Sequence, residues 1–200
     1  MSKNRFASFG SPQTNLLGKL LVASPRAPIG FPFGRAVVLI LQHNEEGVFG
    51  VVLNRPASPE MLSAWQQAAG RPSFAAEKLV AGGPVQGPIL AIHSEAELAE
   101  VEIQGGLFVS VQRDAIDQLS DMELYGDHVP YRIVMGAMNW QPVQLQGEID
   151  NGAWFVVDGA ADLVFADPSV LWENAVRFYG AESIRQLTGI RNLPADPLLN

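Results

Sequence analysis

The sequence predicts an α+β fold, with a mixed β-sheet and helices in a single domain. Two apolar runs, 36–41 and 48–53, are separated by a short polar turn, which is typical of two buried strands joined as a hairpin. Other predicted strands are separated by segments with helix start and stop signals. Because hairpins join antiparallel strands and helical crossovers join parallel ones, we expect both kinds of pairing in the sheet.

The first third of the chain is predicted to form a strand, a hairpin and a helix. Asn44 and Gly47 suit the ends of the hairpin turn. Ser58 can cap the N-terminus of the helix, Pro59 suits its first position and Gly70 can end it. The predicted elements are a strand at 17–23, hairpin strands at 36–43 and 48–54, and a helix from Pro59 to Gly70.

The remainder alternates between short apolar runs and helical segments. Pro142 can start a helix that places Leu145 and Ile149 on one face. Near the C-terminus, Pro168 and Gly180 are start and stop signals that predict one helix followed by a second. The predicted strands are 78–81, 88–93, 107–111, 131–138 and 153–157, the predicted helices are 114–122, the segment after Pro142, the segment from Pro168 and 181–187, and 94–102 is left open as helix or loop.

Length and composition bound the class of protein. Two hundred residues, 48% of them hydrophobic, suit one globular domain, which we place at 16–188 between a flexible N-terminal arm (1–15) and an irregular tail (189–200). The polar N-terminus does not resemble a signal peptide, and no apolar run is long enough to span a membrane. We therefore expect a cytoplasmic protein without a membrane partner. The absence of cysteine excludes disulfides and thiolate chemistry.

The charge of the chain disfavours nucleic acid as a partner. The formal net charge is −8, and the thirteen lysines and arginines are spread singly along the sequence. Nucleic-acid binding draws much of its affinity from clustered basic residues that neutralise phosphates. We therefore expect no direct contact with DNA or RNA.

The sequence lacks the motifs of the common metal, cofactor and nucleophile sites. The three histidines, His43, His93 and His128, lack a metal-ligand spacing, and His43 is better interpreted as a residue at the end of a strand. The glycine-rich run 82–88 lacks the Gly-Lys-Ser/Thr of a phosphate-binding loop and leads into a strand, so we favour a sharp turn there. No G-x-S-x-G motif is present. We predict no metal site and no cofactor.

Several spaced groups of residues form a family-like pattern. They are Leu21-Val22-Ala23-Ser24-Pro25, Arg35 with Val37-Val38, His43-Asn44 with Gly47, Asn54-Arg55-Pro56, Gly82-Gly83-Pro84-Val85, Gly136, Trp140, Gln144-Leu145, Glu148-Ile149 and Ala153-Trp154. In this combination the chain resembles the YqgE/AlgH family over residues 16–185. It departs from the family pattern at Gln146, where the family has Glu, and at Gly152, where it has Asn.

The resemblance implies more about the fold than about the function. It implies a strongly curved, barrel-like mixed sheet flanked by helices. It also implies an association with transcriptional regulation, although the chain has no helix-turn-helix pattern that could carry this out on DNA. The biochemical role of the family is poorly defined.

Polar residues at the ends of apolar strands are the candidates for ligand binding. Because a hairpin pairs the start of one strand with the end of the other, Arg35 and Asn54 should lie at the same end of the sheet. We expect at least one of Arg35 and Arg55 to be partly buried and held by a carboxylate or by carbonyl groups. The alternative is a structural role, with Asn54 bonding turn backbone and Arg35 pairing with a carboxylate. The candidates are Arg35, Asn54, Arg55, Gly82, Gly83, Asn139 and Trp140.

Two functions from different classes follow. The sequence favours a non-enzymatic regulatory or interaction protein that acts through an unidentified protein partner or a small ligand. The alternative is a binding protein or enzyme for a small anionic metabolite or nucleotide, which Arg35, Asn54 and Arg55 would hold. Convergence of the arginines on a pocket would favour the second function, and their dispersal into separate pairs the first.

Overall fold

A computed structural model describes residues 15–27, 32–69 and 74–188 of the chain. Within these residues, ten β-strands form two five-stranded sheets. The first sheet is antiparallel throughout, with the strand order β10-β1-β2-β3-β9. Its strands are β1 (Lys19–Ala23), β2 (Val37–His43), β3 (Val48–Val52), β9 (Met138–Trp140) and β10 (Trp154–Asp158).

The second sheet has the order β4-β8-β5-β7-β6. The sheet is mixed, because β4 and β8 are parallel whereas the other three strand pairs are antiparallel. Its strands are β4 (Leu79–Ala81), β5 (Leu90–His93), β6 (Val101–Gln104), β7 (Leu107–Ser110) and β8 (Tyr131–Met135).

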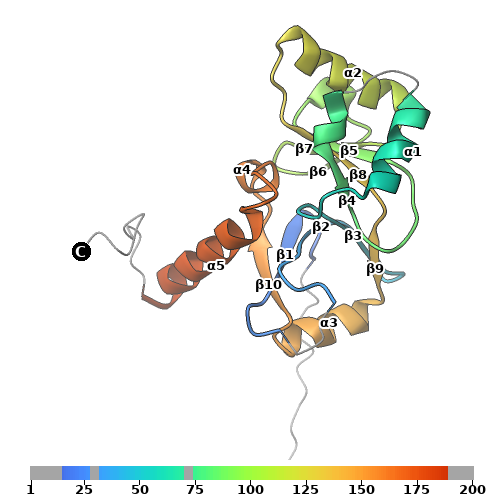
Figure 1. The fold of residues 1–200 in the computed structure, drawn as a ribbon. Helices are drawn as coiled ribbons and strands as arrows, with labels where there is room; N and C mark the ends of the chain where they lie inside the picture. The colour runs from blue at the N-terminus through green and yellow to red at the C-terminus, as the bar shows by residue number, and fades with distance from the viewer. Residues whose placement is uncertain (1–14, 28–31, 70–73, 189–200) are drawn as a thin grey trace, which may run out of the picture.

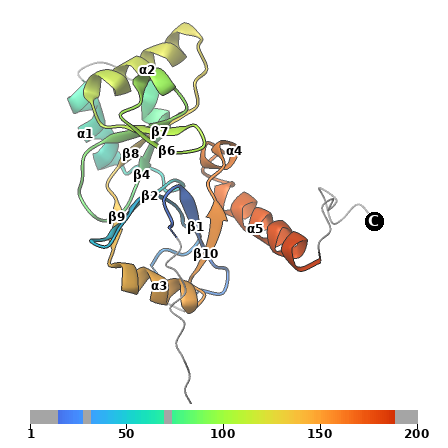
Figure 2. The ribbon, with the colours of Figure 1, turned by 180° about the vertical axis from the view of Figure 1, so that it is seen from behind.

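Helices cover the outer faces of both sheets, which gives four layers (Figure 1, Figure 2). Helices α1 (Pro59–Ala69) and α2 (Arg113–Tyr125) lie outside the second sheet, where Trp65 and Ile116 pack in one apolar cluster. Helix α3 (Pro142–Asp150) covers the first sheet from the opposite side through Leu145. Two 3-10 turns, Phe74–Lys78 and Ala96–Leu98, complete the connections.

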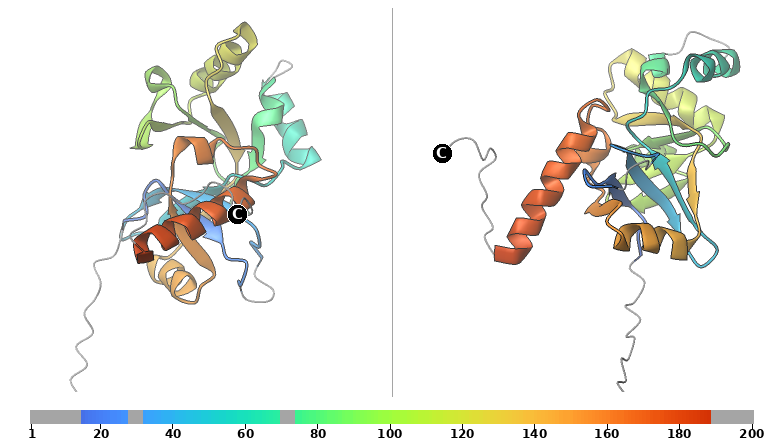
Figure 3. Two further views of the ribbon diagram at one scale, coloured as in Figure 1. Left: turned by 90° about the vertical axis from the view of Figure 1, so that its left-hand side faces the viewer. Right: turned by 60° about the horizontal axis from the view of Figure 1, so that its bottom comes forward.

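The C-terminal helices lie at one side of the layers. Helix α4 (Ala161–Val164) leads into α5 (Leu171–Thr188), whose C-terminal half projects away from the body (Figure 3). The first half of α5 is anchored by buried Leu171 and Ala175, and Tyr179 stacks on Phe155 of β10 with ring centroids 4.2 Å apart. None of the described helices combines the length and apolar character needed to cross a membrane.

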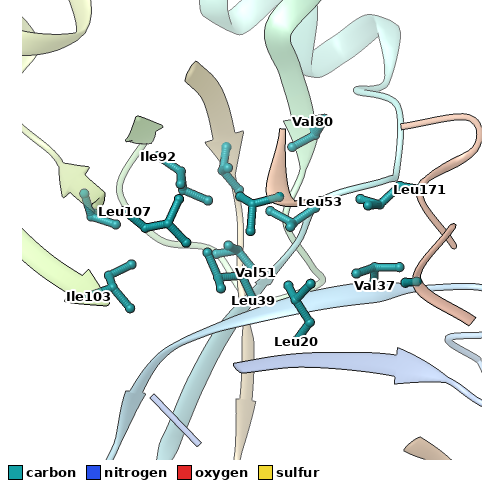
Figure 4. Packing of buried hydrophobic residues seen from close by; sticks show 14 of the residues in the cluster. Leu20, Val37, Leu39, Val51, Leu53, Val80, Ile92, Ile103, Leu107 and Leu171 are labelled. Carbon is teal, nitrogen blue, oxygen red and sulfur yellow. The ribbon is translucent and has the colours of Figure 1, made fainter. Parts of the chain in front are cut away.

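The largest apolar cluster lies between the two sheets. Leu20, Leu39 and Val51 of the first sheet meet Ile92 and Leu107 of the second (Figure 4). Because the helices bury the outer faces as well, the central strands are covered on both sides. This double burial explains why 36–41 and 48–53 are continuous apolar runs rather than alternating ones.

The barrel-like shape that the resemblance implies is not found. The α+β class and the mixed pairing are confirmed, but they are distributed over two sheets, neither of which closes on itself. Closure is not needed to bury these strands, since each inner face is covered by the other sheet and each outer face by helices.

Two element predictions are corrected. One continuous helix, α5, runs through Gly180, where two helices were expected. A glycine inside a helix costs only about 1 kcal/mol, so it is a weak stop signal. The expected strand 131–138 is interrupted at Gly136, and its last residues belong to β9 of the other sheet.

Segment 94–102, left open as helix or loop, contains a 3-10 turn and the start of β6. The hairpin and the helix after Ser58 are confirmed, while the arm (apart from Asn15) and the tail lie outside the described residues.

The two sheets are joined at a seam, formed by residues 52–56, 79–85 and 135–138. The Val52 amide donates to the Gly82 carbonyl at 2.8 Å, and the Ala81 amide donates to the Arg55 carbonyl at 2.9 Å. The Gly82 amide in turn donates to the Met135 carbonyl at 2.7 Å. Backbone segments from both sheets therefore meet directly, without side chains between them.

Glycine is required at the seam because the backbones approach so closely. A Cβ atom at Gly82 would lie 2.2 Å from the carbonyl oxygen of Gly136, and one at Gly83 would lie 2.2 Å from that of Ala137. Gly136 also has a φ of 82°, which L side chains rarely adopt. The run 82–88 does connect β4 to β5 as expected, but it bends only at Pro84 and Val85 bridges Ala137, so its glycines permit close approach rather than a sharp turn.

We predict that Gly82→Ala destabilises the fold by about 1–3 kcal/mol, because the new methyl group forces two backbones apart. The matched control is Gly147→Ala in α3, where the added Cβ has no neighbour within 4 Å. That change should stabilise the protein by up to about 1 kcal/mol through helix propensity. Urea unfolding of both variants checks the prediction, and equal stability of Gly82→Ala and the unaltered protein would contradict it.

Candidate functional site

Arg35 has an unusual backbone conformation. Its φ is 59°, and it is the single non-glycine residue with positive φ in the described part of the chain. For a side chain other than glycine this left-handed conformation costs roughly 1–2 kcal/mol. Surrounding contacts must therefore hold the residue in place.

The side chain of Asn54 supplies the main restraint on Arg35. Its Oδ1 accepts a hydrogen bond from the Val37 amide at 2.9 Å, and its Nδ2 donates to the Arg35 carbonyl at 2.8 Å. Asn54 thus extends the pairing of the hairpin by one step beyond β3. We call this arrangement the Asn54 clamp. The expectation that Arg35 and Asn54 lie at the same end of the sheet is confirmed.

The two arginines of this corner are engaged separately. The Arg35 guanidinium bonds Glu173 of α5 at 2.7 Å and stacks 4.7 Å above the Trp172 ring. Arg55 donates instead to the Gly34 carbonyl at 2.8 Å. The expected partners, a carboxylate or a carbonyl group, are confirmed, but the expected partial burial is wrong, since Arg35 is 64% exposed and Arg55 is also exposed. Both residues flank the strands at an outer corner, where the guanidinium groups keep their hydration.

The remaining candidates lie in two different places. Gly82 and Gly83 belong to the seam, next to Arg55, because the neighbouring Ala81 amide bonds the Arg55 carbonyl. Asn139 and Trp140 pair with Phe49 and Val48 at the turn end of the hairpin. Five or six residues of strand separate them from Asn54, or roughly 20 Å. The seven candidates therefore do not form one site.

Trp140 is part of the packing between α3 and the first sheet. Its indole N–H donates to Glu148 at 3.2 Å, and the indole of Trp154 donates to the same carboxylate oxygen at 2.7 Å. The two rings meet edge to face, with centroids 6.2 Å apart. Gln144 also bonds Glu148, at 3.1 Å. The docking of one helix therefore accounts for the spaced family residues from Trp140 to Trp154, whereas Gly136 belongs to the seam.

A buried histidine–serine pair was not foreseen from the sequence. His93 and Ser110 lie on adjacent strands, are fully buried, and place Nε2 and Oγ 3.0 Å apart. Nδ1 of His93 accepts from the Glu95 amide at 3.3 Å, so the proton lies on Nε2, and Ser110 donates its own proton to the Leu98 carbonyl. Burial lowers the pKa of His93, which favours this neutral form. In this arrangement His93 donates to Ser110 instead of accepting its proton, which is the reverse of a base and its nucleophile.

Arg132 is a second unforeseen feature. It is 5% exposed, and its Nη2 donates to the carbonyl groups of Val164 at 3.1 Å and Ala166 at 2.8 Å. Burial lowers the pKa of Arg132 to about 10, so the guanidinium remains charged at neutral pH. Arg132 extends from the second sheet and Arg35 from the first, and both hold the segment that contains α4 and the start of α5.

A groove of about 420 Å³ lies beside the Asn54 clamp. We define the groove by Pro56, Leu62, Leu79 and Val80, which form its apolar part, and by Glu77 and Asp167. Leu79 and Val80 at its floor are buried, whereas both acids are exposed. Asn54 contributes to the lining, but no arginine or lysine is found among the described residues that line it.

His43 and the other possible metal ligands do not gather. Nδ1 of His43 accepts from the Leu16 amide at 2.9 Å, which ties the end of β2 to the segment before β1. Within the described ranges, no three histidine or carboxylate side chains are placed to share a metal ion.

Comparisons with known proteins agree with this architecture. The model of a family described as AlgH-like matches residues 20–183. A UPF0301 protein of Streptomyces avermitilis is 33% identical over 202 residues, covering 94% of this chain and 96% of its own length. A UPF0301 protein of Myxococcus xanthus is 34% identical, with 88% and 97% covered.

Two solved structures have a similar fold. The solution structure of the AlgH protein from Pseudomonas aeruginosa has a TM-score of 0.64 at 23% identity, covering 92% of this chain and 98% of that one. A crystal structure of a Corynebacterium diphtheriae protein has a TM-score of 0.61 at 26% identity, covering 82% and 87%.

We predict that Asn54→Ala destabilises the protein by about 2 kcal/mol, because it leaves the Val37 amide unpaired at a buried strand. Thermal and urea unfolding measure the change. An effect below about 0.5 kcal/mol would show that the clamp is unimportant.

Arg35 provides the comparison for this prediction. Arg35→Ala should cost only about 1 kcal/mol, since its pairing with Glu173 is exposed. Arg35→Gly removes the same contacts but relieves the left-handed backbone, so it should be more stable than Arg35→Ala by about 1 kcal/mol.

Proposed function

We propose that this chain, which belongs to the AlgH-like family, is a non-enzymatic interaction protein that acts by binding other proteins. In this proposal a regulatory role is exerted through those partners, without contact to DNA. The proposal takes the regulatory association from the family resemblance and the mode of action from the geometry of the chain.

The separate engagement of the two corner arginines carries the proposal. Arg35 pairs with Glu173 and stacks on Trp172, while Arg55 bonds a backbone carbonyl. The neighbouring groove includes Asn54 but neither arginine, and its charged lining residues, Glu77 and Asp167, are acids. An anionic metabolite in the groove would meet like charges rather than a guanidinium clamp.

The polar family motifs support the same proposal. Asn54 restrains backbone, the seam glycines permit close approach, and Glu148 collects two indole N–H groups. The histidine–serine pair has the spacing of a nucleophile and its base, but the proton positions oppose that chemistry. In this proposal these residues stabilise the fold, and the protein acts through other residues on its surface.

The charge of the chain supports action through proteins rather than DNA. A net charge of −8 repels a polyanion, and salt screens this repulsion without reversing it. Acidic proteins of this kind can still influence transcription by binding a protein component of the regulatory machinery.

The test compares anion binding with protein binding. In equilibrium dialysis, we expect nucleotides and small phosphorylated metabolites to show no saturable binding below about 1 mM. A dissociation constant of about 1 mM is weaker than that of most specific ligands. In parallel, cross-linking of the full chain in cells, followed by mass spectrometry, should identify a protein partner in stoichiometric amount.

The arginine variants decide between the two functions. Submillimolar binding of an anion that is lost in Arg35→Ala with Arg55→Ala would overturn the proposal in favour of a metabolite-binding protein. Retention of the protein cross-link in the same double variant, with no anion bound, is the result that the proposal predicts.

A further inference from the structure

We propose that the groove binds a segment of a partner protein in which an apolar side chain stands next to a lysine or arginine. The inference rests on the proposed function and adds the location of the binding surface and the chemistry of the partner. It is drawn from the shape, lining and charge of the groove.

The apolar part of the groove provides the contact for the apolar side chain. Leu79 and Val80 form a buried floor, and Pro56 and Leu62 are more accessible. A volume of about 420 Å³ is within the usual range for sites that take ligand-sized groups. An apolar centre with a charged and hydrated rim is the usual arrangement of a protein–protein contact surface.

The rim selects a basic neighbour. Glu77 comes from the 3-10 turn before β4, and Asp167 comes from the turn between α4 and α5, so the two acids belong to separate parts of the chain. Asp167 accepts hydrogen bonds from the amide and hydroxyl groups of Ser169, at 2.8 and 2.6 Å. These bonds lower the pKa of Asp167 and keep it ionised at neutral pH.

Arg132 lies near Asp167 but does not cancel the negative charge of the rim. Its charge acts on Asp167 at a distance, yet its Nη2 is engaged by two carbonyl groups, and it is not among the described lining residues. A basic segment in the groove would therefore meet two exposed carboxylates. An acidic segment or a nucleic acid would be repelled by them.

The groove is preformed. Pro56 bridges Val80 at the seam, and the Ala81 amide bonds the Arg55 carbonyl, so backbone pairing fixes the floor. Arg132 fixes the start of the turn that carries Asp167 through the Ala166 carbonyl. A partner would not have to order these walls, which reduces the cost of binding.

The experiment uses fluorescein-labelled twelve-residue peptides and the full chain, with anisotropy as the readout. One peptide alternates Leu and Phe with Lys and Arg, one replaces the basic residues with Glu and Asp, and one keeps the basic residues but replaces the apolar ones with Ser and Gln. We expect the basic apolar peptide to bind at least about tenfold more tightly than either of the others.

Neutral variants test whether the groove is the site. Glu77→Gln combined with Asp167→Asn removes both charges, while the amide oxygen at 167 can still accept from Ser169. We expect the affinity of this double variant for the basic apolar peptide to fall by about tenfold, or roughly threefold for each exposed charge removed. The matched control is Glu97→Gln combined with Glu102→Gln, which makes the same change in net charge on and near β6, at the opposite edge of the second sheet. It should change binding less than twofold.

Three outcomes would overturn the inference. They are equal binding of the basic and acidic apolar peptides, equal weakening by the groove variant and its control, and no binding of any peptide up to about 1 mM. The proposed function would survive each of them if the cellular cross-link to a protein partner persisted in the groove variant. Submillimolar anion binding by the unaltered chain, with no cellular cross-link to any protein, would remove both.

Discussion

The close approach of backbones at the seam is the constraint on which the rest of the structure depends. Only because Gly82 and Gly136 carry no side chain can the continuation of β3 pair beside β4 while the chain passes from β8 to β9. These crossings hold the two sheets face to face, so that their inner surfaces share one apolar core. The same pairing fixes Val80 at the floor of the groove.

Two arginines then attach the C-terminal segment to this frame. Arg132 reaches it from the second sheet through backbone carbonyls, and Arg35 reaches it from the first sheet through Glu173 and Trp172. The strained backbone of Arg35 is consistent with a residue whose side chain is needed where glycine would fit more easily. Arg35, Asn54 and Arg55 are thereby engaged in contacts within the chain, and the binding surface that we propose is the neighbouring groove with its apolar and acidic lining.

The sequence predicted correctly those features that depend on residues close together in the chain. The turn at Asn44 and Gly47, the helix after Ser58 and the proximity of Arg35 to Asn54 all follow from short stretches of sequence and are confirmed. The division into two sheets was missed because it depends on contacts between distant strands. The His93–Ser110 pair, the burial of Arg132 and the groove are non-local for the same reason, and no spacing in the sequence marks them.

Hydrogen exchange at the seam tests this account most directly. If the seam makes the two sheets one cooperative unit, the amides of Val52, Gly82 and Ala137 should exchange only through global unfolding. Central amides of both sheets, such as those of Leu39 and Ile133, should then show the same free energy of opening as the seam. The account is contradicted if the seam amides exchange at much lower free energy, or if one sheet opens while the other remains protected.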